Sequence, residues 1–133
     1  MNTIRCPTSE FSGKIALVTG AGAGIGEAVA ERLFAGGAAV ALLGRRLEPL
    51  KAVCRRLDPS GDRTLPFEVD VRNSTAIATA IQAVVARFGK LDWAVNNAGI
   101  TGPAGIPVQN LDEAVWRDVI DTDISGVFYC MKP

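Results

Sequence analysis

A run of glycines between a strand pattern and a helix pattern constrains this chain more than any other feature. Residues 19–26 read Thr-Gly-Ala-Gly-Ala-Gly-Ile-Gly and follow the apolar run Ile15–Val18. Gly20 permits a sharp turn, Gly24 lets the backbone approach a ligand without a Cβ, and Gly26 allows the helix to pack closely on the strand. Free N–H groups at the start of that helix would face an anion. The pattern predicts a turn that cradles a diphosphate.

The spacing of these glycines narrows the class of turn. It follows TGxxxGxG instead of GxGxxG, because Ile25 occupies the last glycine position when counting starts at Gly20. No Lys-Ser or Lys-Thr pair follows the glycines, which argues against a P-loop NTPase. A glycine-rich turn without any ligand is the alternative interpretation.

Strand and helix patterns alternate along the rest of the chain, which is typical of βαβ units and a parallel sheet. Strands are expected at 14–19, 38–43, 64–69 and 91–96, and helices over 24–35, 47–57, 74–88 and from near 111 toward 133. Pro66 cannot donate to a sheet ladder, so the third strand should lie at an edge. The sequence therefore predicts an α/β fold, a Rossmann-type doubly wound parallel sheet with strand order 3-2-1-4.

The third helix has residues at both ends that are typical of helix caps. Asn73 or Ser74 should cap its start and Gly89 should end it. Its inward face is expected to consist of Ile77, Ile81, Val85 and Phe88. We expect residues 1–12 to form an N-terminal tail and residues 13–133 to form one dinucleotide-binding domain.

Composition excludes several classes of function. Fourteen basic residues balance fourteen acidic ones, so neither nucleic acid nor a membrane surface is expected as a partner. No apolar stretch is long enough to span a bilayer. The absence of histidine excludes Ser-His-Asp triads, Cys-His pairs and the usual zinc sites, and no metal is expected. Cys6, Cys54 and Cys130 are interpreted as reduced thiols of a cytoplasmic protein, the last two packed as small apolar groups.

Three motifs in order resemble the short-chain dehydrogenase/reductase family. They are TGxxxGIG at Thr19–Gly26, Asp70-Val71 after the third strand, and Asn-Asn-Ala-Gly at 96–99 after the fourth. The resemblance covers the chain from about residue 12 to its end and implies a nicotinamide cofactor. It implies that Asp70 bonds the adenine amino group with help from the Val71 backbone, and that residues 96–99 brace the first strand and border the adenosine ribose. A helix-capping role for Asp70 and a plain tight turn at 96–99 are the alternatives.

The end of the second strand indicates which nicotinamide cofactor is favoured. A NAD site places Asp or Glu there to bind the ribose 2′-hydroxyl, but this chain has Gly44 followed by Arg45 and Arg46. Gly44 leaves room for a 2′-phosphate, and Arg45 can form a bidentate pair with it. NADP is therefore expected in preference to NAD. The predicted cofactor-binding residues are Thr19, Gly20, Gly22, Gly24, Ile25, Gly26, Arg45, Arg46, Asp70, Val71, Asn97, Ala98 and Gly99.

The catalytic residues implied by the resemblance are a Ser, a Tyr-x-x-x-Lys pair and an Asn. The Ser and the Tyr-x-x-x-Lys pair are absent from this chain. Its one tyrosine, Tyr129, is separated from Lys132 by two residues, whereas the motif has three residues between Tyr and Lys. Tyr129 is therefore interpreted as a packing residue. Asp123 falls at the position of the family's Asn, and an ionised aspartate can only accept hydrogen bonds. Asp123 is the single candidate for a catalytic role.

These observations lead to one expectation and two alternatives. We expect a truncated product or partial sequence of an oxidoreductase that transfers hydride between NADP(H) and a small alcohol or ketone, with this stretch inactive alone. The missing C-terminal strands would leave the outer edge of strand four unpaired. They would also expose apolar residues of the fourth helix, namely Val115, Trp116, Val119, Val127 and Phe128. The parent is expected to be a homo-oligomer. The alternatives are a stand-alone, non-catalytic dinucleotide-binding module and another Rossmann binder such as a methyltransferase.

Overall fold

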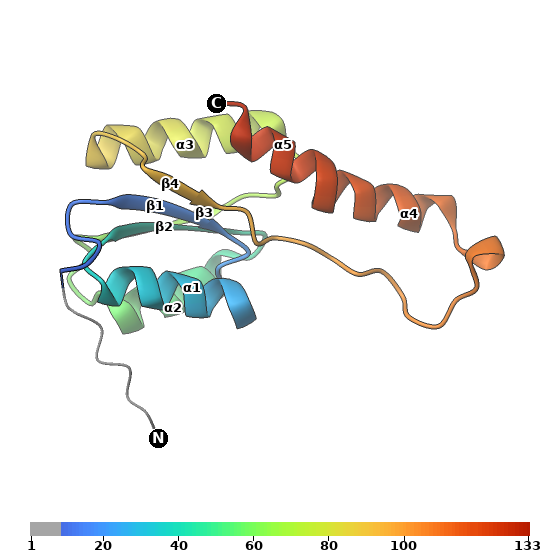
Figure 1. Ribbon diagram of the computed structural model, residues 1–133, viewed down its shortest axis with the longest axis horizontal. Coiled ribbons are helices and arrows are strands. Elements are labelled where there is room, and N and C mark those ends of the chain that lie inside the picture. The colour runs from blue at the N-terminus through green and yellow to red at the C-terminus, as the bar shows by residue number, and fades with distance from the viewer. Residues whose placement is uncertain (1–8) are drawn as a thin grey trace, which may run out of the picture.

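Apolar segments of three to six residues form the strands of one sheet, and the longer segments between them form helices (Figure 1). The computed structural model describes residues 9–133. Its elements are β1 (Ile15–Thr19), α1 (Gly24–Ala35), β2 (Ala39–Gly44), α2 (Leu47–Leu57), β3 (Thr64–Glu68), α3 (Ser74–Phe88), β4 (Trp93–Val95), the 3₁₀ turn η1 (Val108–Asn110), α4 (Glu113–Ile120), the π turn η2 (Asp121–Ser125) and α5 (Gly126–Met131). Cys6 and most of the expected N-terminal tail lie outside the described residues.

The strands form a parallel sheet in the order β3-β2-β1-β4, as predicted. β1 lies between β2 and β4, with Leu17 in register with Ala41 and with Ala94. β3 is outermost, and Pro66 is in register with Leu42 of β2. A proline is tolerated there because the outer edge of β3 has no ladder in which its missing N–H would be needed. The strand order and the edge position of Pro66 are both confirmed.

Helices cover both faces of the sheet, with α1 and α2 on one side and α3 and α5 on the other (Figure 1). Successive strand residues point to opposite faces, so Leu17 joins the core under α3 whereas Val18 joins the core under α1 and α2. Both side chains are almost fully buried. Strands buried on both faces explain the continuous apolar runs in the sequence. The doubly wound architecture is confirmed.

The two described cysteines are part of these cores. Cys54 packs in the core under α1 and α2, and Cys130 packs in the core on the opposite face. Both are free and buried, and burial raises the pKa of each thiol. Their predicted role as small apolar groups is confirmed.

The inward face of α3 differs from the prediction at one position. Ile77 and Val84 are fully buried, whereas Val85 is 41% exposed. At 3.6 residues per turn, Val84 lies only about 20° around the helix from Ile77, but Val85 lies about 80° away. The prediction followed strict four-residue steps, which rotate progressively off the buried stripe. Asn73 caps the helix through its side chain, accepting from the Ala76 N–H at 3.0 Å, and Gly89 ends it with a positive φ of 88°.

The last helical segment is not the uninterrupted helix that the sequence predicts. α4 starts after Asp112, whose carboxylate accepts from the Ala114 N–H at 2.8 Å, and a π turn at η2 separates α4 from α5. The Thr122 hydroxyl donates to the Asp118 carbonyl at 2.8 Å and so competes for a backbone acceptor of the helix. π turns of this kind interrupt helices where the backbone ladder is perturbed.

Among the described residues, β4 pairs only with β1, and large apolar side chains are exposed on the last helical segment. Trp116 and Phe128 are 58% and 57% exposed, and Ile124 is also exposed. The connection from β4 to α4 runs away from the sheet before the chain returns as α4 (Figure 1). The exposure of Trp116 and Phe128 agrees with the expectation from the sequence, whereas Val115, Val119 and Val127, which were expected to be exposed as well, are half-buried.

The first described residues are attached to the sheet. Phe11 donates its N–H to the Gly36 carbonyl at 2.7 Å, and its ring lies edge-on to Trp93 with centroids 5.5 Å apart. A Cβ at Gly36 would overlap the Phe11 ring, so a larger residue at position 36 would require the ring to shift. The end of the expected tail therefore packs against the domain.

Thr19 at the end of β1 fastens the sheet to the loop that follows β4. Its buried hydroxyl oxygen accepts from the Asn97 and Ala98 N–H groups, both at 3.0 Å. The Asn97 amide nitrogen donates in return to the carbonyls of Thr19 and Gly20 at 3.1 and 3.3 Å. These bonds join segments nearly eighty residues apart, so the turn after β1 and the loop after β4 are held as one unit.

A second buried network centres on Asp58, at the end of α2. Its carboxylate accepts from the Arg63 N–H at 2.8 Å, from the Ser60 hydroxyl at 3.0 Å and from the Thr64 hydroxyl at 3.2 Å. Burial alone would raise the pKa of Asp58, but these hydrogen bonds outweigh it, and the pKa is lowered. The carboxylate therefore fixes the loop that leads into β3.

Replacing the Thr19 hydroxyl tests the link between β1 and the β4 loop. Thr19→Val keeps the shape of the side chain but leaves the Ala98 N–H without its acceptor, while the Asn97 N–H keeps only the Val95 carbonyl at 3.1 Å. We expect the free energy of unfolding to fall by about 1–3 kcal/mol. Thr19→Ser keeps the acceptor and should lose about 1 kcal/mol or less. Urea unfolding measures both. Equal stability of the Val and Ser variants would show that the hydroxyl is not needed.

Asp58→Asn tests the loop network and its dependence on pH. Because the folded pKa of Asp58 lies below its unfolded value, the stabilisation is present above the unfolded pKa and is lost as the pH falls through the folded pKa. We expect a loss of about 1–3 kcal/mol at pH 7 that shrinks toward pH 3. Denaturant unfolding at both pH values measures it, and Asp62→Asn, an exposed carboxylate of the same loop, should change stability by under about 0.5 kcal/mol. A loss independent of pH would contradict this role of the charge.

Candidate functional site

A cavity of about 360 Å³ lies where β1 and β2 end and α1 and α2 begin. Three glycines and one alanine make up half of its lining residues, so backbone is accessible over much of its wall. The lining residues are Gly20, Gly22, Ala23, Gly44, Arg45, Arg46, Pro49 and Leu50. The carboxyl ends of parallel strands are where doubly wound folds bind ligands.

The glycines of the turn have different structural reasons to be glycine. Gly20 and Gly24 have positive φ angles of 65° and 61°, which side chains other than glycine rarely adopt. At Gly26 the limit is space, since an added Cβ would overlap the Gly20 carbonyl oxygen and the Asn97 amide. Around Gly24 no atom lies within 4 Å of an added Cβ, so this side of the helix start is open. The roles predicted for Gly20 and Gly26 therefore have a visible steric basis.

The two helices that start at this cavity lack side-chain caps. Ala23 precedes α1 and Arg46 precedes α2, and neither side chain caps the first turn. By contrast, α3 and α4 start away from the cavity and are capped by Asn73 and Asp112. Uncapped N–H groups at a helix start carry partial positive charge and bind anions. Two such starts converge on the same cavity.

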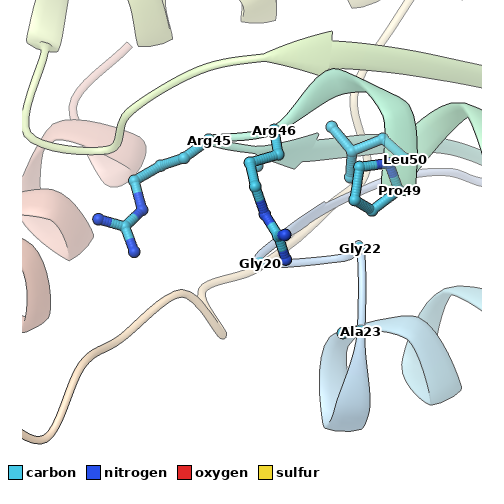
Figure 2. A pocket seen from close by; sticks show the side chains of 8 residues that line it. Gly20, Gly22, Ala23, Arg45, Arg46, Pro49 and Leu50 are labelled. Carbon is cyan, nitrogen blue, oxygen red and sulfur yellow. The ribbon is translucent and has the colours of Figure 1, made fainter.

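Two arginines supply full positive charge there. Figure 2 shows the Arg46 side chain reaching toward the Gly20–Gly22 turn, while Arg45 leaves the chain in a different direction. Arg45 lines the first cavity and also a second, smaller one. No acidic side chain lines the first cavity. An anion in this cavity would meet only positive charge.

The second cavity, of about 150 Å³, is next to the first and shares Gly20, Gly44 and Arg45 with it. It extends between the ends of β1, β2 and β3 and the loop after β4. Its remaining lining residues are Val69, Asp70, Val71, Ala98, Gly99, Ile100 and Thr122. The turn after β3 and the loop after β4, which the sequence identified separately, thus border one space.

Asp70 is the acidic group of this second cavity. The Arg72 side chain donates to both of its carboxylate oxygens, and the Arg72 N–H donates to one of them at 3.0 Å. These hydrogen bonds from Arg72 lower the pKa of Asp70, and the charges of Arg72 and Arg45 lower it further. Asp70 is therefore a carboxylate at neutral pH. It does not cap α3, because Asn73 does.

Asp123 lies in the π turn and faces the loop after β4. Its carboxylate accepts from the Ile100 N–H at 2.8 Å and lies next to Gly99, where an added Cβ would be 3.3 Å from it. The Asp123 carboxylate thus accepts a hydrogen bond from the backbone of the loop after β4. Tyr129 is half-buried with its ring 5.8 Å from that of Phe128, which agrees with a packing residue.

The structure brings most of the predicted site residues together, but not all of them line a cavity. Thr19 and Asn97 lie behind the turn and hold it in place. Gly24, Ile25 and Gly26 form the start of α1 beyond the cavity wall, with Ile25 76% exposed. Sequence reasoning missed the lining residues Ala23, Pro49, Leu50, Val69, Ile100 and Thr122. The rule that strand ends line the ligand site could have found Val69, but nothing local marks Thr122.

The described part of the chain contains no group of three or more metal-ligating side chains placed to hold an ion. Within residues 9–133, no helix is both long enough and apolar enough to cross a membrane.

Comparison with known proteins identifies the family. The family model described as short chain dehydrogenase matches residues 14–133. A 3beta-hydroxysteroid dehydrogenase of Mediterraneibacter gnavus is 40% identical over 122 residues, which cover 92% of this chain and 44% of that protein. Among solved structures, a 3-ketoacyl-(acyl-carrier-protein) reductase from Brucella melitensis complexed with NADH is 31% identical with a TM-score of 0.85, over 92% of this chain and 49% of that one.

A second solved structure, an NAD⁺-bound xylitol dehydrogenase, is 36% identical with a TM-score of 0.87, over 93% of this chain and 47% of that one. The chain thus spans about half the length of the relatives that it matches. The family model, by contrast, covers nearly all of the chain, and its match agrees with the strand order and the glycine turn. This chain belongs to the short-chain dehydrogenase/reductase family of oxidoreductases, which have a dinucleotide-binding fold.

Proposed function

We propose that the two neighbouring cavities hold one nicotinamide dinucleotide, with its diphosphate at the start of α1 and its adenosine half between β2 and β3. The observation that carries the proposal is the first cavity itself. It combines a glycine wall, two uncapped helix starts and two arginines, with no acidic lining residue. Each of these features favours an anionic ligand lying close to the backbone.

The residues present fit such a cofactor. Gly20, Gly22 and Ala23 present backbone where a diphosphate has to come close. Asp70 offers an acceptor in the second cavity, and Ala98 and Gly99 offer a flat, small-residue wall there. When bound, the nicotinamide ring would supply hydride transfer.

We infer NADP as the preferred cofactor, although two of the solved relatives hold NADH and NAD⁺. The end of β2 has Gly44, where a NAD site has a carboxylate for the ribose hydroxyls. Arg45 and Arg46 follow at once and line the cavity. A guanidinium pairs with a phosphate through charge-assisted hydrogen bonds, and a nearby carboxylate would repel it. This local chemistry supports the extra phosphate of NADP.

The activity we propose for the whole protein is reduction or oxidation of a small carbonyl or alcohol by NADP(H). The family relationship and the names of the dehydrogenases that match the chain support this substrate class. We further propose that the whole protein is cytoplasmic and a homo-oligomer, with the exposed apolar residues of α4 and α5 as the support for an assembly. Residues 1–133 then provide cofactor binding and leave proton transfer to groups that they lack. Asp123, at the family's Asn position, would act by holding the loop at Ile100.

Removal of one arginine tests the preference for NADP. Arg45→Ala should weaken NADP binding by about ten- to a hundredfold, because a charge-assisted pair with the 2′-phosphate is lost, and should weaken NAD binding far less. Arg46→Ala is tested alongside, since its side chain reaches toward the Gly20–Gly22 turn (Figure 2). Calorimetric titration with both cofactors measures the ratio.

Arg55→Ala is the matched control for this prediction. Arg55 is exposed on α2 and lines neither cavity, so its removal changes the net charge equally without touching the site. It should leave both affinities within about twofold of the wild type, because exposed charges are screened. Equal losses of NADP and NAD affinity in Arg45→Ala would rule out contact with the 2′-phosphate.

The purified 133-residue chain should bind NADPH without turning it over. Hydride transfer to a ketone needs a proton donor of suitable pKa, and the single tyrosine is half-buried beside Phe128. With NADPH binding first established by fluorescence, absorbance at 340 nm should stay at the buffer rate across a panel of small ketones and aldehydes. Sustained, enzyme-dependent NADPH oxidation would contradict the expected inactivity.

A further inference from the structure

Arg72 connects two elements beside the second cavity, the turn after β3 and α4. It follows β3 in the turn before α3, and its guanidinium donates to the two Asp70 oxygens at 3.0 Å from Nε and 2.6 Å from Nη2. Its remaining nitrogen, Nη1, donates to the carboxylate of Asp118 on α4. One guanidinium thus joins the turn after β3 to a helix 46 residues further along the chain.

This arrangement fixes the orientation of the Asp70 carboxylate. The Asp70 carboxylate accepts hydrogen bonds from Nε and Nη2 of Arg72, and its Oδ1 also accepts from the Arg72 backbone N–H. Asp70 lines the second cavity, whereas Arg72 does not. Arg72 therefore lies behind Asp70 as seen from the cavity, and it acts on anything inside the cavity only through that carboxylate.

The network is too exposed to serve mainly as a stabiliser of the fold. The side chains of Asp70, Arg72 and Asp118 are 33%, 41% and 42% exposed. Exposed ion pairs contribute little to stability, because water screens them and ordering the long side chains costs entropy. The Arg72 guanidinium is planar and binds one carboxylate through two nitrogens and a second carboxylate through the third. Such an arrangement does fix the orientation of the carboxylates relative to the guanidinium.

We propose that Arg72 is a positioning residue for recognition of the base: anchored on α4 by Asp118, it holds Asp70 as an oriented acceptor for an exocyclic amino group of the purine. This rests on the proposed function, in which the adenosine half of the dinucleotide occupies the second cavity. A fixed carboxylate accepts from the amino group of adenine and faces an acceptor instead when the base is hypoxanthine, whose carbonyl oxygen replaces that amino group. Two acceptors without a proton between them repel, so the site discriminates between the bases.

The consequence is a selectivity that depends on a residue that does not touch the ligand. With Arg72 removed, the Asp70 carboxylate loses three hydrogen bonds from that side chain and gains rotational freedom. It can then turn from the base toward solvent at a smaller energetic cost. The unfavourable contribution of hypoxanthine to the binding free energy then becomes smaller, and so does the favourable contribution of adenine.

The test compares NADP with its hypoxanthine analogue, nicotinamide hypoxanthine dinucleotide phosphate, by calorimetric titration of the full 133-residue chain. The wild type should bind the adenine form about tenfold or more tightly, as expected for one hydrogen bond to a charged group. Arg72→Met, which keeps the aliphatic stem, should reduce this ratio at least threefold. Arg72→Lys should retain part of it, because an ammonium keeps the charge but not the fork. Asp118→Asn should reduce it less than Arg72→Met does.

Arg117→Met is the matched control. Arg117 lies on α4 one residue from Asp118, is 74% exposed and pairs only with Glu113 four residues earlier among its described contacts. It should leave the ratio unchanged. Thermal unfolding of every variant is measured in parallel. Should Arg72→Met fail to fold, Arg72→Lys and Asp118→Asn decide, and an unchanged ratio in both overturns the proposal.

Three outcomes separate this proposal from the one it rests on. If both affinities fall equally in Arg72→Met and the ratio is kept, Arg72 is a structural tie and the proposal is wrong, while cofactor binding stands. If the wild type binds both dinucleotides equally, Asp70 does not read the amino group, and the proposal is wrong for that reason. If the wild type binds neither, the proposed function fails together with it.

Discussion

The bond between Thr19 and the loop after β4 is the constraint on which the rest of this structure depends. A hydroxyl at the end of the central strand accepts from two N–H groups of that loop, and the Asn97 amide donates back to the turn. Gly26 completes the arrangement, because only a residue without a Cβ lets α1 approach the turn this closely. The strand end, the glycine turn and the loop after β4 therefore form one rigid frame, and both cavities open along it.

Charge is divided between the two cavities that this frame holds. The first has two uncapped helix starts and the arginines at the end of β2, whereas the second has the Asp70 carboxylate. Arg45 lines both cavities, and its positive charge contributes to lowering the pKa of Asp70 in the second cavity. A ligand with phosphates at one end and an amino-bearing base at the other matches this division. The same division explains how a net charge of zero is compatible with a locally positive cavity.

The sequence predicted the strand order and the limits of the first three helices well, because periodicity, Pro66 and the glycines act locally. It failed where geometry over several turns or contacts between distant segments decide. Strict four-residue steps placed Val85 inward, although rotation along α3 buries Val84. The π turn coincides with a hydrogen bond from the Thr122 hydroxyl to the Asp118 carbonyl of the same helix. No local spacing marks the contacts that Arg72 makes with Asp118 or that Asp123 makes with Ile100. Such contacts form only once the sheet places β3, β4 and α4 together.

The central claim is that the glycine turn and the adjoining arginines bind a nicotinamide dinucleotide through its phosphates. Its most direct test is calorimetric titration of the unmodified chain with NADP and with NAD at two ionic strengths. The account predicts that both bind at low salt, that NADP binds more tightly, and that its advantage shrinks as salt screens the arginines. Absence of binding by either dinucleotide to a folded sample, or tighter binding of NAD at low salt, would contradict it.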